Sequence, residues 1–498
     1  MKMCLLKLLP VALLISVTLS SAHAELTSGA TAAVNYSRLC SSCHGPELTG
    51  GQGASLISQI YLHGTSDESV AHSIRAGYLD KGMPGWSGVL SENDIQALVD
   101  FIKNHREENS PERLAQLDKE AKQKIVNASV KSELYDFHLK IVAETDKPFG
   151  MAVLPDGRVL VTEVAGRLRV IEKGGLLPEP VKGTPAGHPS DGVFNRVLLD
   201  VAVHPDYQHN RWIYLVCADA ARDADGNPSV VETIVRGRLR NNSWMDSETL
   251  VQVPVANTAT GRLTFDGKGY MYLATSVEPG VTEARDGKPF GLATLIKMPP
   301  QDLGDPILRG KILRFHDDGR IPVDNPFINT PGAAPIWSFG HRNPQGLAID
   351  PSSGWLWSTE HGPRGGDELN LIRPGHNYGF PVISYGTSYN GITFTAEIKH
   401  EGMEQPVINW TPSIGVSNIV FYEGNVFQKW KRNLFIGSLV QEELYRVVLD
   451  GEQVKVRETL LKGLGRIRNI ASGSDGQIYL EIELKTQGVI VRLMPDKR

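Results

Sequence analysis

The chain has 498 residues, of which 41% are hydrophobic and 21% are charged. This balance excludes a disordered protein, and the length exceeds what one hydrophobic core normally supports, so we expect at least two domains. The formal net charge is −5 and no long basic run occurs, which excludes a nucleic-acid partner held by charge.

The first 24 residues have the pattern of a secretory signal peptide. Lys2 and Lys7 make a short basic start, an apolar stretch follows over residues 8–19, and residues 22–24 read Ala-His-Ala. The apolar stretch is too short for a membrane span, and no later stretch reaches the roughly 20 apolar residues that a spanning helix needs. We therefore expect an exported protein without a membrane span, located in a bacterial periplasm.

The four cysteines do not form a disulfide scaffold. Cys4 leaves with the signal peptide, and Cys217 stands in an apolar, aromatic run that predicts a buried strand. Cys40 and Cys43 belong to the sequence Cys-Ser-Ser-Cys-His, which ends at His44 and is the attachment signature of a c-type haem. Two thiols at this spacing can add to the haem vinyl groups, and the imidazole that follows can bind the iron. A thioredoxin-type dithiol is the alternative, but it lacks a βαβ context and does not need the histidine.

A second iron ligand is expected further along this domain. Met83 lies in the sequence Lys-Gly-Met-Pro-Gly-Trp, a loop in which a side chain can turn towards a cofactor. Thioether ligation raises a haem potential and suits an electron acceptor. His63 and His72 are the competing ligands, without a comparable loop. The segment around Met83 resembles the distal loop of small class I cytochromes c.

Residues 25–106 suffice for this small all-α cytochrome domain. A helix leads into the haem motif, and Ser91 is predicted to cap a last helix that packs back on the first. Residues 107–136 are charged and rich in Ala, Lys and Glu, and they predict a linker helix that starts after Ser110. The apolar residues of the last cytochrome helix recur at helical spacing, at Ile95, Leu98, Val99 and Ile102.

From residue 137 to residue 498 the pattern changes to short β-rich runs separated by Gly, Pro, Asp and Asn turns. Such repeats predict an all-β propeller with six blades, and a pair of irregular β-sandwiches is the alternative. The uneven spacing of the repeats predicts long inserted loops, which usually build a site on one face. A unit of two apolar strands joined by a turn recurs with centres at Val161, Tyr214, Tyr272, Trp357, Phe435 and Tyr479.

Several longer segments of the second domain are distinctive. They include "SFGHRNPQGLAIDPSSGWLWSTEHGPRGGDELNLIRPGHNYGFP", "PFGMAVLPDGRVLVTE" and "RIRNIASGSDG". On these segments, residues 137–498 resemble the soluble quinoprotein glucose/sorbosone dehydrogenases, close to the aldose sugar dehydrogenases. The resemblance implies a six-bladed propeller that binds pyrroloquinoline quinone (PQQ) and calcium and oxidises a sugar or related alcohol.

The resemblance also implies a set of residues that hold PQQ. Arg342 and Asn343 match the pair that contacts the cofactor, and Trp410 matches an aromatic wall beside it. Arg466 and Arg468 match the arginines that hold the cofactor's carboxylates. Alternation along an extended strand would place these two arginines on one face, where both can meet one anion.

Two calcium sites follow from the same resemblance. Gly362 and Pro363 match positions whose backbone carbonyl groups bind the calcium beneath PQQ, and carbonyl oxygen suits this hard cation. Glu368 and Tyr378 match positions of a second, structural calcium.

Three positions depart from the family pattern. Thr258 stands where the family has the His that takes the substrate's hydroxyl proton, and an unassisted hydroxyl is too weak a base near neutral pH. Asn195 replaces a Gln that contacts the cofactor, and Val440 replaces a Lys found in many members. The carboxylate clamp is therefore kept, whereas the base and part of the quinone contact are not.

We expect a periplasmic quinohaemoprotein oxidoreductase that oxidises an aldose or related alcohol or aldehyde and passes the electrons to the fused haem c and then to a respiratory carrier. A fused electron acceptor has a use only beside an electron donor. His361 is the expected replacement base, with His204 and His341 as other candidates. A non-catalytic binding module and an electron-transfer protein that keeps PQQ or calcium only structurally remain the alternatives. Substrate contacts are expected on the loops at 276–305 and 384–405.

Overall fold

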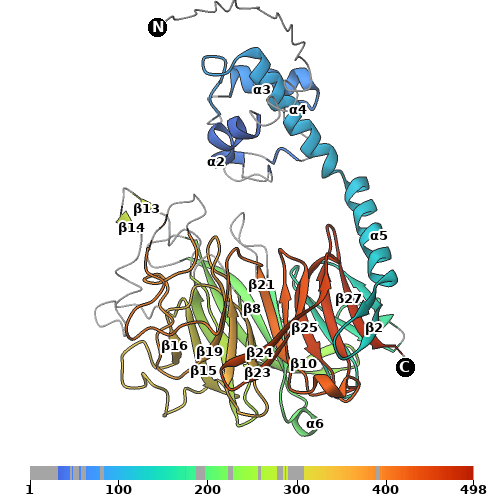
Figure 1. The fold of residues 1–498 in the computed structure, drawn as a ribbon, viewed down its shortest axis with the longest axis vertical. Coiled ribbons are helices and arrows are strands. Elements are labelled where there is room, and N and C mark those ends of the chain that lie inside the picture. The colour runs from blue at the N-terminus through green and yellow to red at the C-terminus, as the bar shows by residue number, and fades with distance from the viewer. Residues whose placement is uncertain are drawn as a thin grey trace, which may run out of the picture. The chain divides into compact units, whose positions relative to one another are not determined.

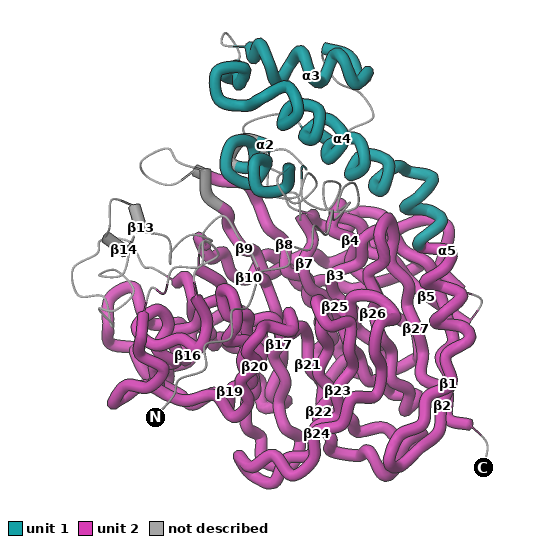
Figure 2. The backbone as a smooth tube through the Cα atoms, turned by 45° about the horizontal axis from the view of Figure 1, so that its top comes forward, with its two compact units in different colours: residues 1–117 teal, residues 118–498 magenta. Residues whose placement is uncertain are grey.

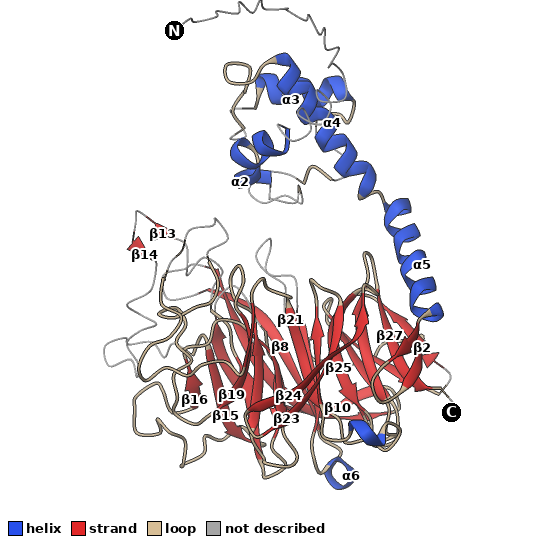
Figure 3. Ribbon diagram, viewed as in Figure 1, coloured by secondary structure: helices blue, strands red, loops and turns tan. Residues whose placement is uncertain are grey.

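The computed structural model describes residues 32–44, 48, 55–57, 63–78, 83–173, 175–186, 197–222, 228–255, 260–277, 284–285, 288–289, 308–387, 393 and 395–496. The chain divides between residues 117 and 118 into two compact units, drawn in teal and magenta in Figure 2. Helices build the first unit and strands build most of the second (Figure 3). Within the described residues no helix is long and apolar enough to cross a membrane. The predicted signal peptide lies outside the described ranges.

The first unit is helical, as the sequence predicts. Residues 32–39 form a helix, and α2 (Ser41–His44), α3 (Asp67–Ala76) and α4 (Glu92–Glu108) follow. The predicted cap of α4 is confirmed, because the Ser91 hydroxyl accepts the N–H of Asp94 while the Asp94 carboxylate accepts the N–H of Ser91. The first and last helices pack together, as predicted, with the rings of Tyr36 and Phe101 5.5 Å apart.

Six antiparallel sheets form the blades of the second unit, and many of their strands are labelled in Figure 1. The first contains β3 (Pro148–Val153), β4 (Val159–Glu163), β5 (Arg167–Glu172) and β6 (Gly175–Leu176), and the second contains β7 (Leu198–Val203), β8 (Ile213–Arg222), β9 (Pro228–Arg240) and β10 (Ser243–Val255). The third contains β11 (Leu263–Phe265), β12 (Tyr270–Ala274), β15 (Lys311–His316) and β16 (Ile336–Phe339), and the fourth contains β17 (Pro344–Ile349), β18 (Leu356–Glu360), β19 (Asp367–Ile372) and β20 (Ile408–Trp410). The fifth contains β21 (Val416–Phe421), β22 (Leu434–Ser438), β23 (Glu443–Asp450) and β24 (Gln453–Lys462). The sixth contains β25 (Arg466–Ser472), β26 (Ile478–Glu483), β27 (Gly488–Pro495), β2 (Asp136–Thr145) and β1 (Ser129–Lys131).

Short elements lie in the connections between these strands. β13 (Ala284–Arg285) and β14 (Lys288–Pro289) pair with each other, and α6 (Tyr207–Asn210) and the 3₁₀ helix η2 (Gln428–Trp430) are single turns. None of them belongs to a blade.

The sixth blade closes the ring, because β2 from the start of the unit pairs with β27 from the end of the chain. The innermost strands β3, β7, β11, β17, β21 and β25 contact one another in a closed circle. The predicted six-bladed propeller is confirmed, and each predicted repeat centre lies on the second strand of a blade. These centres are Val161 in β4, Tyr214 in β8, Tyr272 in β12, Trp357 in β18, Phe435 in β22 and Tyr479 in β26.

Apolar side chains between neighbouring sheets form the core of the second unit. Phe149, Tyr214, Trp357 and Phe435 are at most 2% exposed. Burying a side chain of this size contributes about 1.5–3 kcal/mol. Cys217 lies buried in β8, which confirms the strand predicted for it.

The helix α5 (Pro111–Asn127) carries the chain into the second unit. Asp118 is buried, and its carboxylate accepts the backbone N–H groups of Lys485 and Thr486 at 2.7 and 3.0 Å. These two residues lie in the turn between β26 and β27. The middle of α5 is therefore fixed to the sixth blade at Asp118.

Candidate functional site

The first unit contains a cavity of about 180 Å³ with a mainly apolar lining. Cys40, His44 and Met83, three of the predicted haem residues, lie in its wall. The side chain of Cys43 falls outside the described residues. A thiol, an imidazole and a thioether around an apolar cavity form the donor set that a covalently held haem needs. The residues present therefore fit haem c.

The loop that carries Met83 is held against the end of α3 by close backbone contacts. Tyr78 and Met83 exchange two backbone hydrogen bonds, of 2.8 and 3.1 Å. Gly77 has a φ of +68°, and a Cβ at Gly85 would lie 2.6 Å from the last carbonyl oxygen of α3. Glycine is the residue that permits both features, so the glycines set where Met83 lies.

Two histidines compete with Met83 for the iron. His63 lines the same cavity and stacks on Tyr78, with ring centroids 3.7 Å apart. His72 is exposed on α3 and does not belong to the cavity wall. Met83 stays the predicted ligand, and of the two competitors only His63 has access to the cavity.

In the second unit, four of the predicted PQQ residues lie where two of the innermost strands begin. Arg342 and Asn343 directly precede β17, and Arg466 and Arg468 lie in the first half of β25. We call this end of the propeller the starting face. Asn195 and Thr258 precede β7 and β11 in the same way, but both lie outside the described residues.

Arg262 joins four blades at the centre of the starting face. Its buried guanidinium donates from Nε to the carbonyl oxygen of Gln345 at 3.0 Å, and from Nη1 to that of Phe149 at 3.2 Å. Nη1 also lies 3.3 Å from Oδ1 of Asp200, whose Oδ2 accepts the N–H of Leu263. The first four blades therefore meet on one side chain, and sequence reasoning missed it because all its partners are distant in the chain.

Irregular strand pairing is common at the same face. Strands β3, β7, β17, β21 and β25 each carry a register shift near their start. In β25 the extra residue is Arg468, which interrupts the alternation predicted for Arg466 and Arg468. The two arginines nevertheless share one anion, the carboxylate of Glu483. Its Oε2 lies 2.6 Å from Nη2 of Arg468 and 3.5 Å from Nε of Arg466.

Hydrogen bonds fix two loops of the fourth blade beside this cluster. Nη1 of Arg342 donates to the carbonyl oxygens of His361 and Gly362 at 3.1 and 2.9 Å. The N–H of His361 donates to the carbonyl oxygen of Asn343, and the N–H of Gly362 donates to Oδ1 of Asp367. The predicted residues before β17 and after β18 are thus brought together.

A small cavity of about 10 Å³ lies between these loops, close to the smallest size that can hold one water molecule. Its wall contains Gly362, Pro363, Glu368 and Tyr378, the four predicted calcium residues, together with Glu360. The prediction divided the first four between two sites, and the structure places them around one cavity.

Glu360 and Glu368 lie directly opposite each other in β18 and β19. Burial raises the pKa of Glu360 to about 8, and burial followed by the charge of Glu360 raises the pKa of Glu368 well above its usual value. Like charges facing each other are unfavourable, and a cation between them removes the repulsion. Within the described ranges no three His, Cys, Asp or Glu side chains converge on a metal position, so carbonyl oxygens would complete the ligand set. That mixture suits calcium.

Tyr378 contributes its ring to this cavity. Its hydroxyl group donates to the carbonyl oxygen of Leu371 and accepts the N–H of Arg373 at 2.8 Å. The ring stacks on His341 with centroids 4.5 Å apart. The hydroxyl is therefore engaged with the backbone, and calcium ligation by Tyr378 stays a prediction.

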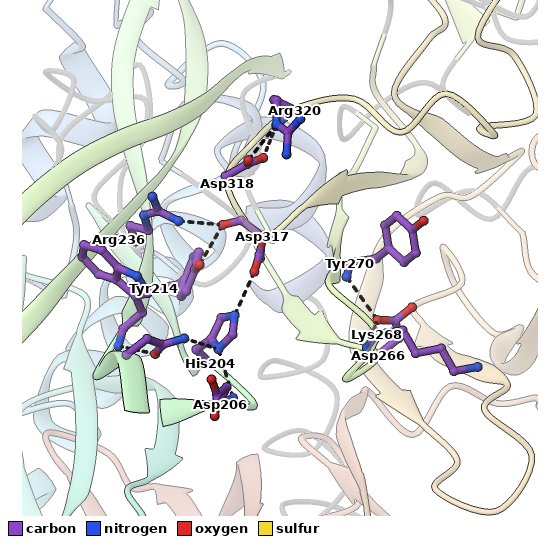
Figure 4. Close-up of polar contacts among 12 residues, drawn as sticks. His204, Asp206, Tyr214, Arg236, Asp266, Lys268, Tyr270, Asp317, Asp318 and Arg320 are labelled. Atoms are coloured by element: carbon purple, nitrogen blue, oxygen red, sulfur yellow. Dashed lines mark hydrogen bonds and ion pairs between the residues drawn. The ribbon is translucent and has the colours of Figure 1, made fainter. Parts of the chain in front are cut away.

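His204 lies far from the predicted cofactor residues. It directly follows β7, whose six residues span roughly 17–20 Å from the starting face. Its Nε2 lies 3.0 Å from Oδ2 of Asp317 (Figure 4), and its Nδ1 accepts from Nδ2 of Asn210. This position excludes His204 as a base at the starting face.

The other two candidate histidines are both in the fourth blade region. Nε2 of His341 is 2.8 Å from the Ser338 hydroxyl and Nδ1 is 3.2 Å from Oε2 of Glu360, so both ring nitrogens have partners. Nε2 of His361 is buried and has no hydrogen-bond partner. Burial lowers the pKa of His361 to about 4, which leaves a neutral imidazole with one free nitrogen. Of the three candidates, His361 is the one with an available acceptor atom.

The structure also describes the surroundings of Trp410 and Val440, two further positions singled out in the sequence. Trp410 is 4% exposed, packs in the core near Tyr445, and has the guanidinium of Arg457 5.0 Å from its ring centroid. Its role as an aromatic wall stays a prediction. Val440 is 62% exposed in the turn between β22 and β23, and its N–H donates to the carbonyl oxygen of Ile414.

Comparison with known proteins finds a matching family for each of the two units. Residues 145–492 match the glucose/sorbosone dehydrogenase family, and residues 27–102 match the family described as subunit III of cbb3-type cytochrome c oxidase. Over 364 residues the chain is 36% identical to the aldose sugar dehydrogenase YliI of Escherichia coli, covering 70% of this chain and 90% of that protein.

Solved structures agree with this match. The apo-form of the soluble aldose sugar dehydrogenase from Escherichia coli has a TM-score of 0.61 and 33% identity, covering 72% of this chain and 100% of that chain. The PQQ-bound form of the aldose sugar dehydrogenase from Streptomyces coelicolor has a TM-score of 0.53 and 25% identity, covering 72% of this chain and 98% of that chain. The chain therefore belongs to the glucose/sorbosone dehydrogenase family and carries a cytochrome c domain at its N-terminus.

Proposed function

We propose that this protein is a quinohaemoprotein oxidoreductase that uses PQQ to oxidise an aldose or a related alcohol or aldehyde. The electrons pass one at a time to haem c in the same chain and then to a respiratory carrier in the periplasm. One observation carries the proposal: a cluster of arginines at the starting face of the propeller occurs in one chain with Cys40, His44 and Met83 around one apolar cavity. An oxidising site and an electron acceptor are thereby combined.

The starting face suits a planar ligand with several carboxylates. Arg342, Arg466 and Arg468 supply fixed positive charge, and guanidinium groups bind carboxylates through paired hydrogen bonds. Arg468 and Arg466 already hold one carboxylate, that of Glu483, so their geometry supports anion binding. PQQ, when bound, would supply the two-electron acceptor.

His361 is the residue that we propose to take the substrate's hydroxyl proton. Its free Nε2 is buried, and its backbone N–H is tied to Asn343, which fixes the loop. The neutral imidazole is the form that accepts a proton, and the low pKa keeps it neutral at physiological pH. This role replaces the histidine that the family has at the position of Thr258.

Calcium is proposed to occupy the cavity between Glu360 and Glu368. The two facing carboxylates and the carbonyl groups of Gly362 and Pro363 supply the oxygen ligands. Arg342 also lines this cavity and donates to the carbonyl oxygen of Gly362, so the two carboxylates would offset the charges of both the calcium ion and the guanidinium.

The test is haem reduction in the oxidised, purified protein after addition of PQQ, calcium and a panel of aldoses, aldehydes and simple alcohols. Reduction that needs both PQQ and one class of substrate supports the proposal and names the substrate. A parallel sample with dithionite shows that the haem accepts electrons. If dithionite alone reduces the haem, the oxidoreductase proposal fails and the propeller is better described as a binding module.

A further inference from the structure

Two buried ionisable groups near the starting face, one in the sixth blade and one directly before the third, have atoms without a hydrogen-bond partner. Both carboxylate oxygens of Glu481 and Nη2 of Arg262 are buried and unpartnered. Glu481 lies directly opposite Asn469 in the neighbouring strand β25. Asn469 and Arg262 both donate to the carbonyl oxygen of Phe149, at 3.4 and 3.2 Å. The carboxylate of Glu481 and the guanidinium of Arg262 are therefore neighbours.

Unpartnered atoms of two such groups are places where ordered water binds. Buried polar atoms in native proteins almost always have a partner, and internal water supplies it where protein atoms do not. Water between Glu481 and Arg262 would satisfy three unpartnered polar atoms at once. It would also give the carboxyl group of Glu481 a partner that can carry a proton.

Charged groups from several strands face Glu481. Burial raises its pKa to about 8, the charges of Arg262 and Arg468 oppose this rise, and Glu483 and Asp200 add to it. The carboxyl group therefore holds a proton near neutral pH and releases it with a small change in surroundings. A group with this balance is suited to passing protons on.

Glu483 is a partly exposed carboxylate that can exchange protons with solvent. It lies two residues after Glu481 on the same strand, so both side chains project from the same face of β26. The side chain of Glu483 is 31% exposed, and its Oε2 accepts from Nη2 of Arg468. Arg468 thus links the proposed cofactor position to the exposed end of this carboxyl pair.

We propose that Glu481 and Glu483 form a proton exit from the starting face, with Glu481 as the buried relay and Glu483 as the solvent end. The inference rests on the proposed function.

Oxidation of an alcohol carbon to a carbonyl group breaks one C–H and one O–H bond and releases two electrons and two protons. The electrons leave for the haem one at a time. Nε2 of His361 takes the proton of the O–H bond and gives it up to the same exit before the next turnover. Glu481 passes its own proton through water to Glu483 and takes up the proton that remains when the electrons of the C–H bond have left for the haem.

The first experiment measures how fast solvent reaches this carboxyl group, and it needs neither cofactor nor substrate. Infrared spectra of the full chain are recorded at about pH 7, where a carboxyl group with a pKa near 8 is protonated. The Glu481→Gln variant identifies the band of Glu481, and Glu232→Gln identifies that of Glu232. Glu232 is the matched control, since it is equally buried, burial raises its pKa to about 8, and its Oε2 has no partner.

On transfer to D₂O, we expect the Glu481 band to shift at least about tenfold faster than the Glu232 band, because a relay group exchanges with solvent. The Glu483→Gln variant should slow the shift at Glu481 and leave that at Glu232 unchanged. Exchange at Glu481 no faster than at Glu232, or no protonated band at Glu481, overturns the proposal.

The second experiment follows turnover. With a substrate identified by haem reduction, Glu481→Gln should slow proton release to an indicator dye by about 10²-fold and remove one ionisation from the pH profile. An unchanged rate and pH profile overturns the relay. If no substrate reduces the haem in the wild type, the proposed function fails, while the exchange experiment still decides whether the proton exit exists.

Discussion

At the scale of single residues, the starting face depends on charged side chains that are almost fully buried. Arg262 is 2% exposed and contacts Phe149, Asp200 and Gln345, each from a different blade. A buried charge is tolerated when it has partners, and removal of one partner leaves the other uncompensated. The same residue type at the surface contributes little.

We predict that Arg262→Met lowers the free energy of unfolding by about 3–5 kcal/mol, because Asp200 then remains buried without its cation. Chemical denaturation followed by circular dichroism measures the change. Arg320→Ala is the control, since its side chain is 77% exposed and pairs with Asp318 at the surface. A loss for Arg262→Met no larger than that of the control would show that the blades do not depend on this contact.

A second prediction concerns the pH dependence of the free energy of unfolding, and it rests on Glu232. Its Oε1 accepts the N–H of Thr260, and burial raises its pKa to about 8, above the ordinary 4.5. The native state therefore holds a proton that the unfolded state has lost between pH 4.5 and 8, so this group's contribution to stability falls as the pH rises through that range. We expect Glu232→Gln to gain stability relative to the wild type from pH 5 to pH 8. Parallel denaturation curves at a series of pH values measure this, and a constant difference would show that Glu232 is ionised in the native protein.

At the scale of elements, local sequence predicted positions well where a single strand or helix decides them. Ser91 was identified as a cap from its place before an apolar helix, and the six repeat centres fall on equivalent strands. The bulge at Arg468 was not predictable, because the sequence around the extra residue looks like that of a regular strand. The facing pair Glu360 and Glu368 depends on the register of β18 and β19, which the sequence does not display.

The loop of Met83 is an element that glycine geometry controls. We predict that Gly85→Ala moves this loop away from α3, since the added Cβ would lie 2.6 Å from a carbonyl oxygen of that helix. The haem should stay covalently attached, while its visible spectrum changes and its reduction potential falls through loss of thioether ligation. Gly88→Ala is the control, because a Cβ there meets nothing within 4 Å. Equal spectra of the two variants would contradict Met83 as the ligand.

At the scale of the whole molecule, fold class and family were accessible from the sequence, whereas the arrangement at the propeller axis was not. Repeats and the haem motif are local and periodic, so they are visible along the chain. Contacts such as Arg262 with Gln345 join residues that only the closure of the ring brings together. The choice of His361 over His204 likewise needed the direction of β7. His361 lies at the starting face, whereas His204 lies beyond the opposite end of β7.

Calcium is expected to stabilise the propeller as a whole. A ligand that binds only the native state adds about 2.7 kcal/mol at a concentration 100 times its dissociation constant. We predict that a calcium chelator lowers the Tm of the second unit and that added calcium restores it. Glu368→Gln should abolish this difference, because one of the two facing carboxylates is lost. A Tm that does not respond to chelator in the wild type would remove the calcium assignment.

The anchoring of α5 through Asp118 has a kinetic consequence. The cytochrome domain is joined covalently to α5, which is fixed on the sixth blade at Asp118, so under the proposed function the electron acceptor belongs to the same chain as the electron donor. Under the proposed function, electron transfer within the chain is a first-order process. Dilution of the protein would leave its rate unchanged, and a shortage of soluble carrier would slow only the later step.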